Sequence, residues 1–227
     1  MQAETVTPVI NVLLVEDHPM FRERLASIIS KRGDMAVCAE ADNVLDAIRY
    51  AETLRPNIAI VDITLRGSNG LDFLKDLKAR EIDLPVLVLS MHDEAIYAER
   101  VLRAGARGYI TKYEASSEVM AAIEQVLNGE VYLSRQMTSR MLGRFASVGK
   151  KGETRDVNSL TDRELDVFQR LGRGETARDV ASALHVGITT IDTYRDRIKE
   201  KLGLKSGNEL QRRAMEWVQE NPASAAS

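Results

Sequence analysis

Cysteine and histidine are scarce in this sequence, and no long apolar segment interrupts it. Cys38 is the single cysteine, which excludes a disulfide framework and a cluster of thiolate metal ligands. The histidines, His18, His92 and His185, show no spacing typical of metal ligands. No apolar run approaches the ~20 residues of a membrane span, and residues 1–8 lack the basic and apolar blocks of a secretory signal. We therefore expect a cytoplasmic protein with no membrane partner.

A strong excess of basic charge is also absent, since the net charge is −3. The charges are unevenly spread. Residues 1–145 carry 17 Lys and Arg against 21 Asp and Glu, whereas residues 146–227 carry 14 against 13. This difference has the direction expected for a C-terminal part that binds nucleic acid, but charge alone does not establish it.

Short apolar segments alternate with helical patterns over the first 130 residues. The expected strands are 10–15, 35–39, 57–63, 85–89 and 108–111. Each is followed by apolar residues at helical spacing, such as Leu71, Leu74 and Leu77. Five such strand–helix units predict an α/β domain with a parallel sheet covered by helices on both faces.

The apolar run that follows Pro56 ends in a carboxylate, Asp62. The carboxyl ends of parallel strands meet at one edge of an open sheet, where such folds hold their ligands. Taken alone, this stretch favours Asp62 as a strand-ending residue that caps the next turn. However, the other strands end in polar residues that should converge with it: Glu16, Asp17, Ser90 and Lys112.

The chemistry of this group favours phosphoryl transfer. Three neighbouring carboxylates repel one another unless a cation lies among them, and oxygen ligands suit Mg²⁺. An ionised Asp62 can attack phosphorus, and Lys112 and Ser90 can bind the transferred oxygens. Taken singly, Ser90 has the alternative of a helix cap, Tyr109 of a half-buried strand residue and Lys112 of a solvated charge.

Residues 10–128 resemble the receiver domain of response regulators. The resemblance rests on Glu16-Asp17, Asp62, Gly70, Ser90, Tyr109 and Lys112. It implies a flavodoxin-like fold, phosphorylation of Asp62 by a sensor histidine kinase, and rearrangement of Ser90 and Tyr109. It also implies Mg²⁺ bound by Asp17, Asp62 and the backbone carbonyl of Thr64, with Glu16 as a supporting acid. Arg66 and Tyr113 stand where the family frequently has proline.

The segment 131–158 is expected to connect two domains. A short helix is predicted from about Arg135, and Ser147 to Ser159 is almost free of apolar residues, which is typical of a flexible linker. The expected division is a receiver domain at 9–130 and a helical domain at 159–221.

The C-terminal part has a helical pattern throughout. Thr161 and Glu164 form a predicted capping box, Thr176 opens a second helix, and Gly187 makes the turn to a third. That third helix is expected from about Thr189 to Leu202, with a fourth around 210–218. Two short helices joined by a tight turn indicate a helix-turn-helix unit.

Residues 158–220 resemble a LuxR-type DNA-binding domain, from Leu160-Thr161-x-Arg163-Glu164 through Lys201-Leu202-Gly203. Both domains in this order resemble the NarL/FixJ class of transcriptional response regulators. The resemblance implies that the third helix enters the major groove of double-stranded promoter DNA. The candidate contacts are Thr189, Thr190, Asp192, Thr193, Arg195, Asp196, Arg197 and Lys199.

Asp192 and Asp196 depart from this family, which often has basic residues there. An acid can accept a hydrogen bond from a cytosine amino group, while Arg195, Arg197 and Lys199 contact phosphates. The alternative is a charged helix in a bundle that binds protein rather than DNA.

The sequence thus predicts a transcription regulator that is switched by phosphorylation and pairs into a homodimer when phosphorylated. One alternative is an interaction protein that does not bind DNA. Another is a phosphatase that forms an aspartyl phosphate, but Thr64 stands where such an enzyme carries its second acid. We therefore expect a protein that is not an enzyme.

Overall fold

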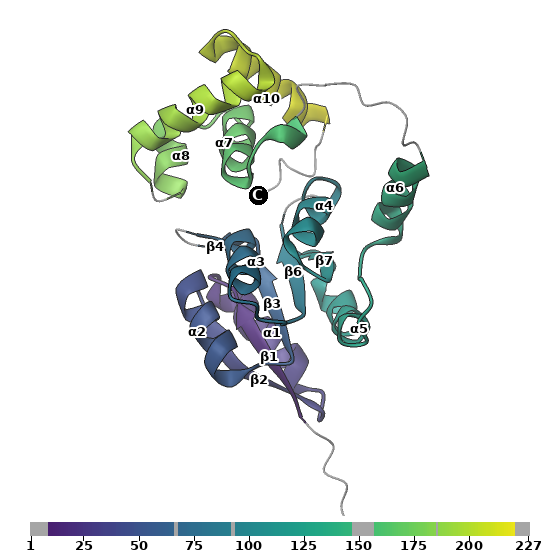
Figure 1. Ribbon diagram of the computed structural model, residues 1–227. Coiled ribbons are helices and arrows are strands. Elements are labelled where there is room, and N and C mark those ends of the chain that lie inside the picture. The colour runs from purple at the N-terminus through teal and green to yellow at the C-terminus, as the bar shows by residue number, and fades with distance from the viewer. Residues whose placement is uncertain (1–8, 66–67, 92–93, 147–156, 185, 221–227) are drawn as a thin grey trace, which may run out of the picture. The chain divides into compact units, whose positions relative to one another are not determined.

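The computed structural model of the chain describes residues 9–65, 68–91, 94–146, 157–184 and 186–220. They divide into two compact units, of which the first ends at Arg140 and the second begins at Met141. Figure 1 labels their helices and strands. Within the described ranges, no helix has both the length and the apolar composition needed to cross a membrane.

Strands and helices alternate in the first unit. They are β1 (Ile10–Val15), α1 (Pro19–Ser30), β2 (Met35–Ala41), α2 (Val44–Leu54), β3 (Ile58–Asp62), β4 (Thr64–Leu65), β5 (Ser68–Asn69), α3 (Gly70–Ala79), β6 (Val86–Ser90), α4 (Glu94–Ala104), β7 (Gly108–Thr111) and α5 (Ala115–Leu127). Helix α6 (Arg135–Ala146) follows and begins at its predicted residue.

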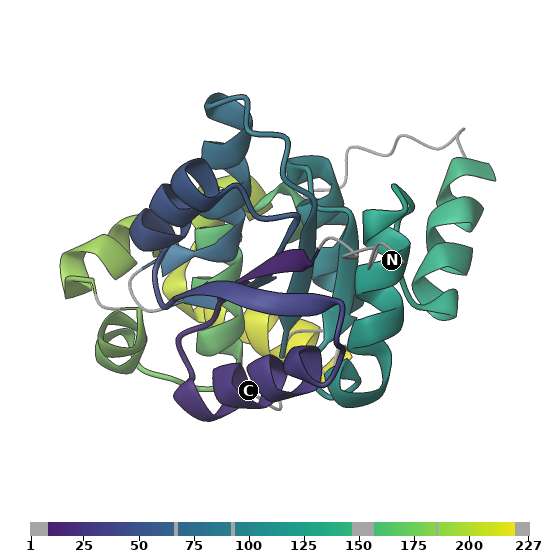
Figure 2. The same cartoon turned by 90° about the horizontal axis from the view of Figure 1, so that it is seen from below.

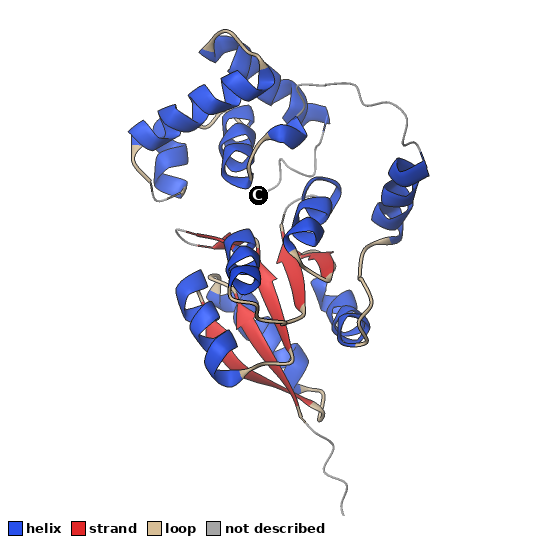
Figure 3. Cartoon of the chain, in the orientation of Figure 1, coloured by secondary structure: helices blue, strands red, loops and turns tan. Residues whose placement is uncertain are grey.

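A parallel sheet with the strand order β2-β1-β3-β6-β7 forms the middle of this unit (Figure 3). The central strand, β3, is buried along its whole length. A strand covered on both faces has no polar alternation, which explains its apolar run up to Asp62. The strand order is that of the flavodoxin-like α/β folds, so the predicted fold class is confirmed.

Helices α1 and α5 cover one face of the sheet (Figure 2). Helices α2, α3 and α4 cover the other face, where α3 packs against both α2 and α4. Leu14 and Ile60 belong to the core under α1 and α5. Their neighbours Leu13 and Val61, also fully buried, point to the opposite face because side chains alternate along a strand. Each such buried side chain contributes about 1.5–3 kcal/mol to folding.

A short ribbon that is not among the predicted strands lies between β3 and α3. Here β4 and β5 form a short antiparallel ribbon, with Thr64 opposite Asn69 and Leu65 opposite Ser68. Asn69 also caps α3, because its Oδ1 accepts a hydrogen bond from the backbone N–H of Leu71 at 2.9 Å. Strands of two residues are too short to show a periodic pattern, so the sequence contains no signal for them.

The chain beyond α5 lies along the edge of the sheet. The N–H of Tyr109 donates to the carbonyl oxygen of Tyr132 at 3.0 Å, and the N–H of Tyr132 donates to that of Arg107 at 3.0 Å. The carboxylate of Glu94, the first residue of α4, accepts hydrogen bonds from the backbone N–H and the hydroxyl of Ser134. The segment Val131–Ser134 is therefore attached to β7 and α4.

Beyond α6, whose last residues 141–146 already belong to the second unit, the described part of that unit consists mainly of four helices. They are α7 (Asp162–Gly172), α8 (Ala177–Ala183), α9 (Ile188–Leu202) and α10 (Gly207–Glu220), preceded by a 3₁₀ turn (Val157–Ser159). Phe168, Ile191, Ile198 and Leu210 belong to its core. Most of the predicted linker, 147–156, lies outside the described residues, and Val157 at its end is buried.

Candidate functional site

Asp62 lies at the carboxyl end of β3 and is almost fully buried, with 3% of its surface exposed. Its Oδ2 lies 2.8 Å from the Nζ of Lys112, which directly follows β7. The same Nζ lies 2.6 Å from Oε2 of Glu16, which directly follows β1. Lys112 is thus a buried cation between two carboxylates rather than a solvated surface charge.

The buried position changes the acidity of these groups. Burial raises the pKa of Asp62 to about 7, although the ammonium of Lys112 lowers it, and the carboxylate of Glu16 raises it further. Burial by itself lowers the pKa of Lys112, but the carboxylates of Asp62 and Glu16 outweigh this effect and raise it. Lys112 therefore stays protonated, and the charge state of Asp62 depends on the cations around it.

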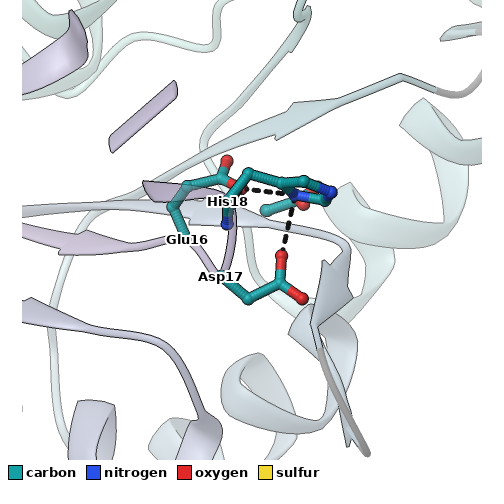
Figure 4. Close-up of side chains that lie close together, drawn as sticks. Glu16, Asp17 and His18 are labelled. Carbon is teal, nitrogen blue, oxygen red and sulfur yellow. Dashed lines mark hydrogen bonds and ion pairs between the residues drawn. The ribbon is translucent and has the colours of Figure 1, made fainter. Parts of the chain in front are cut away.

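Asp17 and His18 complete an acidic cluster at this edge of the sheet (Figure 4). The Nδ1 atom of His18 lies 2.9 Å from Oδ1 of Asp17 and 3.0 Å from Oε1 of Glu16. One ligand atom from each of Glu16, Asp17, His18 and Asp62 lies within 4.8 Å of all the others. The sequence predicted that Glu16, Asp17 and Asp62 converge, and they do. It did not predict that His18 joins them, because the histidines of the sequence show no spacing typical of metal ligands.

Thr64, the third predicted metal ligand, lies two residues beyond Asp62 in β4 and is exposed. Its backbone N–H donates a hydrogen bond to Oδ1 of Asp62 at 3.2 Å. Gly70, which follows the β4–β5 ribbon, lies so close to the end of β3 that a Cβ atom at position 70 would be 2.2 Å from the carbonyl oxygen of Asp62. Only glycine permits that approach.

Ser90 lies on β6, the strand next to β3, and Tyr109 lies on β7, the strand next to β6; both are fully buried. The carbonyl oxygen of Ser90 accepts a hydrogen bond from the N–H of Lys112 at 2.8 Å, which joins the ends of β6 and β7. Ser90 is the last residue of β6, and α4 begins only at Glu94. Its alternative as the cap of that helix is therefore wrong, as is the half-buried alternative for Tyr109.

The second candidate site is the exposed face of α9. Its inner face carries Ile191 and Ile198, which are completely buried. The predicted DNA contacts all lie on this helix, and none of them is buried. They are Thr189, Thr190, Asp192, Thr193, Arg195, Asp196, Arg197 and Lys199.

Ion pairs along α9 explain how its acids and bases share one face. Arg195 contacts Asp192 at 3.1 Å, and Lys199 contacts Asp196 at 2.8 Å, each one turn apart. The hydrogen bond from Lys199 lowers the pKa of Asp196. Arg197 forms no ion pair with any other described residue. Arg197 borders an open hollow of about 250 Å³ that is otherwise lined by Thr189, Thr190, Thr193 and Tyr194.

A buried ion pair fixes α9 against α7. The carboxylate of Glu164, 2% exposed, contacts the Nζ of Lys201 at 2.6 Å and accepts from the N–H of Thr161 at 2.7 Å. Thr161 and Glu164 form the predicted capping box, and Thr176 with Asp179 forms a second one at the start of α8. The Glu164–Lys201 contact thus joins α9 to α7, and the capping boxes define where α7 and α8 begin.

The parallel five-stranded sheet with its acidic edge, followed by a helix-turn-helix unit, defines the class of DNA-binding response regulators. Residues 12–124 match the family of response regulator receiver domains, and residues 158–214 match the luxR family of bacterial regulatory proteins. The chain belongs to the two-component response regulators that join a receiver domain to a LuxR-type helix-turn-helix domain.

Individual proteins agree with this assignment. A protein of Pseudomonas aeruginosa is 34% identical over 86% of this chain and 92% of its own length. The DNA-binding transcriptional activator EvgA of Escherichia coli is 29% identical over 86% of this chain and 93% of its own length. Among solved structures, a LuxR-family two-component response regulator from Aurantimonas is 29% identical, with a TM-score of 0.57, over 61% of this chain and 99% of that one.

Proposed function

We propose that this response regulator is switched by phosphorylation of Asp62. The observation that carries the proposal is the buried contact of 2.8 Å between Asp62 and Lys112, beside the acidic pair Glu16-Asp17. A carboxylate held next to a fixed cation is suited to accept a dianionic group, because the cation offsets the added charge. The donor is a phosphohistidine of a sensor histidine kinase.

In the proposed reaction, a carboxylate oxygen of Asp62 attacks phosphorus, and the bond from phosphorus to the donor's leaving group breaks. The product is an aspartyl phosphate, and the electron pair of the broken bond leaves with the donor. Lys112 would bind a phosphoryl oxygen, and Ser90 would donate a hydrogen bond to another after the site rearranges. We assign Tyr109 to the same rearrangement, because it is fully buried on β7, the strand that Lys112 follows.

The donor set fits Mg²⁺, the cofactor that we propose. Asp17, Asp62 and the backbone carbonyl of Thr64 would hold the ion, with Glu16 as a supporting acid. Three carboxylates within reach of one another provide the oxygen ligands that this ion prefers. When bound, the ion neutralises negative charge on the phosphoryl group and the acids. It would also favour the ionised form of Asp62, which burial disfavours.

We propose that the second unit reads promoter DNA through α9, and that phosphorylated chains pair as homodimers. The proposed domains are 9–130 for the receiver and 159–221 for the DNA-binding part, joined by 131–158. Arg195, Arg197 and Lys199 would contact phosphates, and Thr189, Thr190, Asp192, Thr193 and Asp196 would face the bases. A kinase and promoter DNA as partners imply a cytoplasmic protein.

The aspartyl phosphate is proposed as a switch rather than as an intermediate of an enzyme. A phosphatase that uses an aspartate nucleophile carries a second acid two residues later, and Thr64 stands at that position. Turnover of a generic phosphomonoester, such as p-nitrophenyl phosphate, would contradict this part of the proposal.

Labelling with a small phosphodonor tests the phosphoacceptor. We expect incorporation that requires Mg²⁺, stops in EDTA and is lost in Asp62→Asn. The matched control is Asp72→Asn, which removes a half-exposed carboxylate of α3 and should label like the wild type. Equal labelling of Asp62→Asn, or labelling that ignores EDTA, would show that the site is wrongly assigned.

A further inference from the structure

The imidazole of His18 is directed at the acidic cluster, not at the helix that it precedes. His18 is the N-cap residue of α1, but its side chain makes no capping hydrogen bond. Its Nδ1 instead lies between the carboxylates of Asp17 and Glu16, at 2.9 and 3.0 Å (Figure 4). The backbone N–H of His18 also donates to Oε1 of Glu16 at 3.0 Å, which fixes the position of the residue.

The four side chains offer a mixed set of ligands. Nδ1 of His18 and one oxygen each from Glu16, Asp17 and Asp62 lie within 4.8 Å of one another, so one ion can contact them together. The carboxylates are almost fully buried, whereas 65% of the His18 side chain is exposed at the mouth of the cluster. Imidazole nitrogen is a poor ligand for Mg²⁺ and a better one for first-row transition ions, whose affinity for such a site rises from Mn²⁺ through Fe²⁺ and Ni²⁺ to Cu²⁺.

We propose that His18 is a direct ligand for divalent transition ions such as Mn²⁺, and that its Nδ1 makes the site prefer them over Mg²⁺. This inference rests on the metal site of the proposed function. The coordinating ring is the neutral imidazole that carries its proton on Nε2, so that the Nδ1 lone pair points at the ion. Asp17 and Asp62 supply the oxygens, and Glu16 remains paired with Lys112 through its other oxygen, at 2.6 Å.

Pulsed electron paramagnetic resonance of Mn²⁺ bound to the full-length chain tests this directly. A coordinated imidazole gives a ¹⁴N coupling, which we expect in the wild type and not in His18→Gln. His185→Gln, in the second unit, is the matched control and should keep the coupling. We expect His18→Gln to weaken Mn²⁺ binding at least about tenfold and Mg²⁺ binding by less than about twofold. His18 is largely exposed, so the variant should fold, and His18→Asn provides a second test.

Two results would overturn the proposal. One is Mn²⁺ binding without a ¹⁴N coupling in the wild type. The other is an equal loss of Mn²⁺ and Mg²⁺ affinity in His18→Gln, which would make His18 a residue that only positions the carboxylates. A different result would show that the proposed metal site itself is wrongly assigned: Asp17→Asn would then leave the binding of both ions unchanged.

Discussion

At the scale of the residue, the acids of α9 limit the charge that the helix can present to DNA. Asp196 holds the ammonium of Lys199 at 2.8 Å, and Asp192 holds Arg195 at 3.1 Å. We expect Asp196→Ala to release Lys199 to a phosphate. Binding to a scrambled duplex should then strengthen, and the slope of log affinity against log salt should steepen by about one. The preference for the best site, meaning the duplex that the wild type binds most tightly, over the scrambled duplex should fall, because the acid no longer selects a cytosine amino group.

Titrations of the best site and of a scrambled duplex at several salt concentrations measure both effects. Arg197→Ala is the opposing comparison, since Arg197 has no ion pair among the described residues. It should weaken both duplexes and flatten the slope. Glu216→Ala, on the exposed side of α10, is the neutral control. If Asp196→Ala weakens both duplexes equally, the acid is structural and our orientation of α9 is wrong.

The residues of the phosphoacceptor site differ in how far the sequence predicts them. Asp62, Ser90 and Lys112 follow apolar strands, so the geometry of a parallel sheet is sufficient to bring them together. The roles of these residues remain predictions. His18 was missed because its approach to Asp17 depends on the turn between β1 and α1. Metal ligands on neighbouring residues have no spacing rule comparable with the one-turn spacing along a helix.

At the scale of the element, the contact between α7 and α9 should respond to pH. Burial raises the pKa of Glu164, but the hydrogen bonds from Lys201 and Thr161 outweigh it and leave the pKa below its usual value of 4.5. The folded protein therefore binds fewer protons here than the unfolded chain does. The resulting stability is present above pH 4.5 and is lost as the pH falls through the folded-state pKa.

We expect Glu164→Gln to lower the free energy of unfolding of the second unit by about 1–2 kcal/mol at pH 7. This is less than a fully buried pair loses, because Lys201 is 35% exposed. The difference from the wild type should shrink below pH 4.5. Trp217, the only tryptophan, reports this unit alone in urea unfolding. Glu216→Gln, whose ion pair is exposed, should change little. A pH-independent loss would contradict the ion-pair explanation.

The segment after α5 is held at the sheet edge by few contacts, and Ser134 is central to them. Its N–H and hydroxyl donate to Glu94, and its Oγ accepts from the N–H of Met137 at 3.1 Å. We expect Ser134→Ala to cost about 1 kcal/mol locally. Hydrogen exchange at Tyr132 and Met137 should then accelerate several-fold. Ser117→Ala, an exposed serine of α5, is the control. Unchanged exchange would show that β7 alone holds the segment.

The elements themselves were predicted well where a periodic pattern spans several residues. The five sheet strands were found from their apolar runs, and α7 and α8 from Thr161 and Thr176 at their caps. The β4–β5 ribbon was missed because two residues contain no period. The attachment of Ser134 to Glu94 was missed because the two residues are 40 positions apart and each is common on protein surfaces.

At the scale of the whole molecule, the two compact units have separate buried cores, one around the parallel sheet and one around Phe168 and Ile191. The charge difference between the halves of the sequence agreed weakly with a C-terminal part that binds nucleic acid and said nothing of separate cores. The alternation of strand and helical patterns, followed by helices alone, pointed strongly to two separate units. If the proposed phosphorylation of Asp62 controls α9, its effect has to pass from one unit to another or from one chain to another, because the two sites lie in different units.

The last prediction is that phosphorylation of Asp62 promotes pairing of chains on DNA. One α9 helix reads only a few base pairs, and a second copy on a neighbouring half-site supplies the missing specificity. With a small phosphodonor and Mg²⁺, we expect a larger sedimentation coefficient and about tenfold tighter binding to a duplex with two half-sites. Asp62→Asn should show neither change.

Moving the half-sites apart by about five base pairs places them on opposite faces of the DNA and should remove the gain. A duplex with one half-site should gain little, because it offers no place for the second chain. Equal sedimentation and equal affinity with and without the phosphodonor would mean that phosphorylation acts within one chain, and pairing would have no part in the switch.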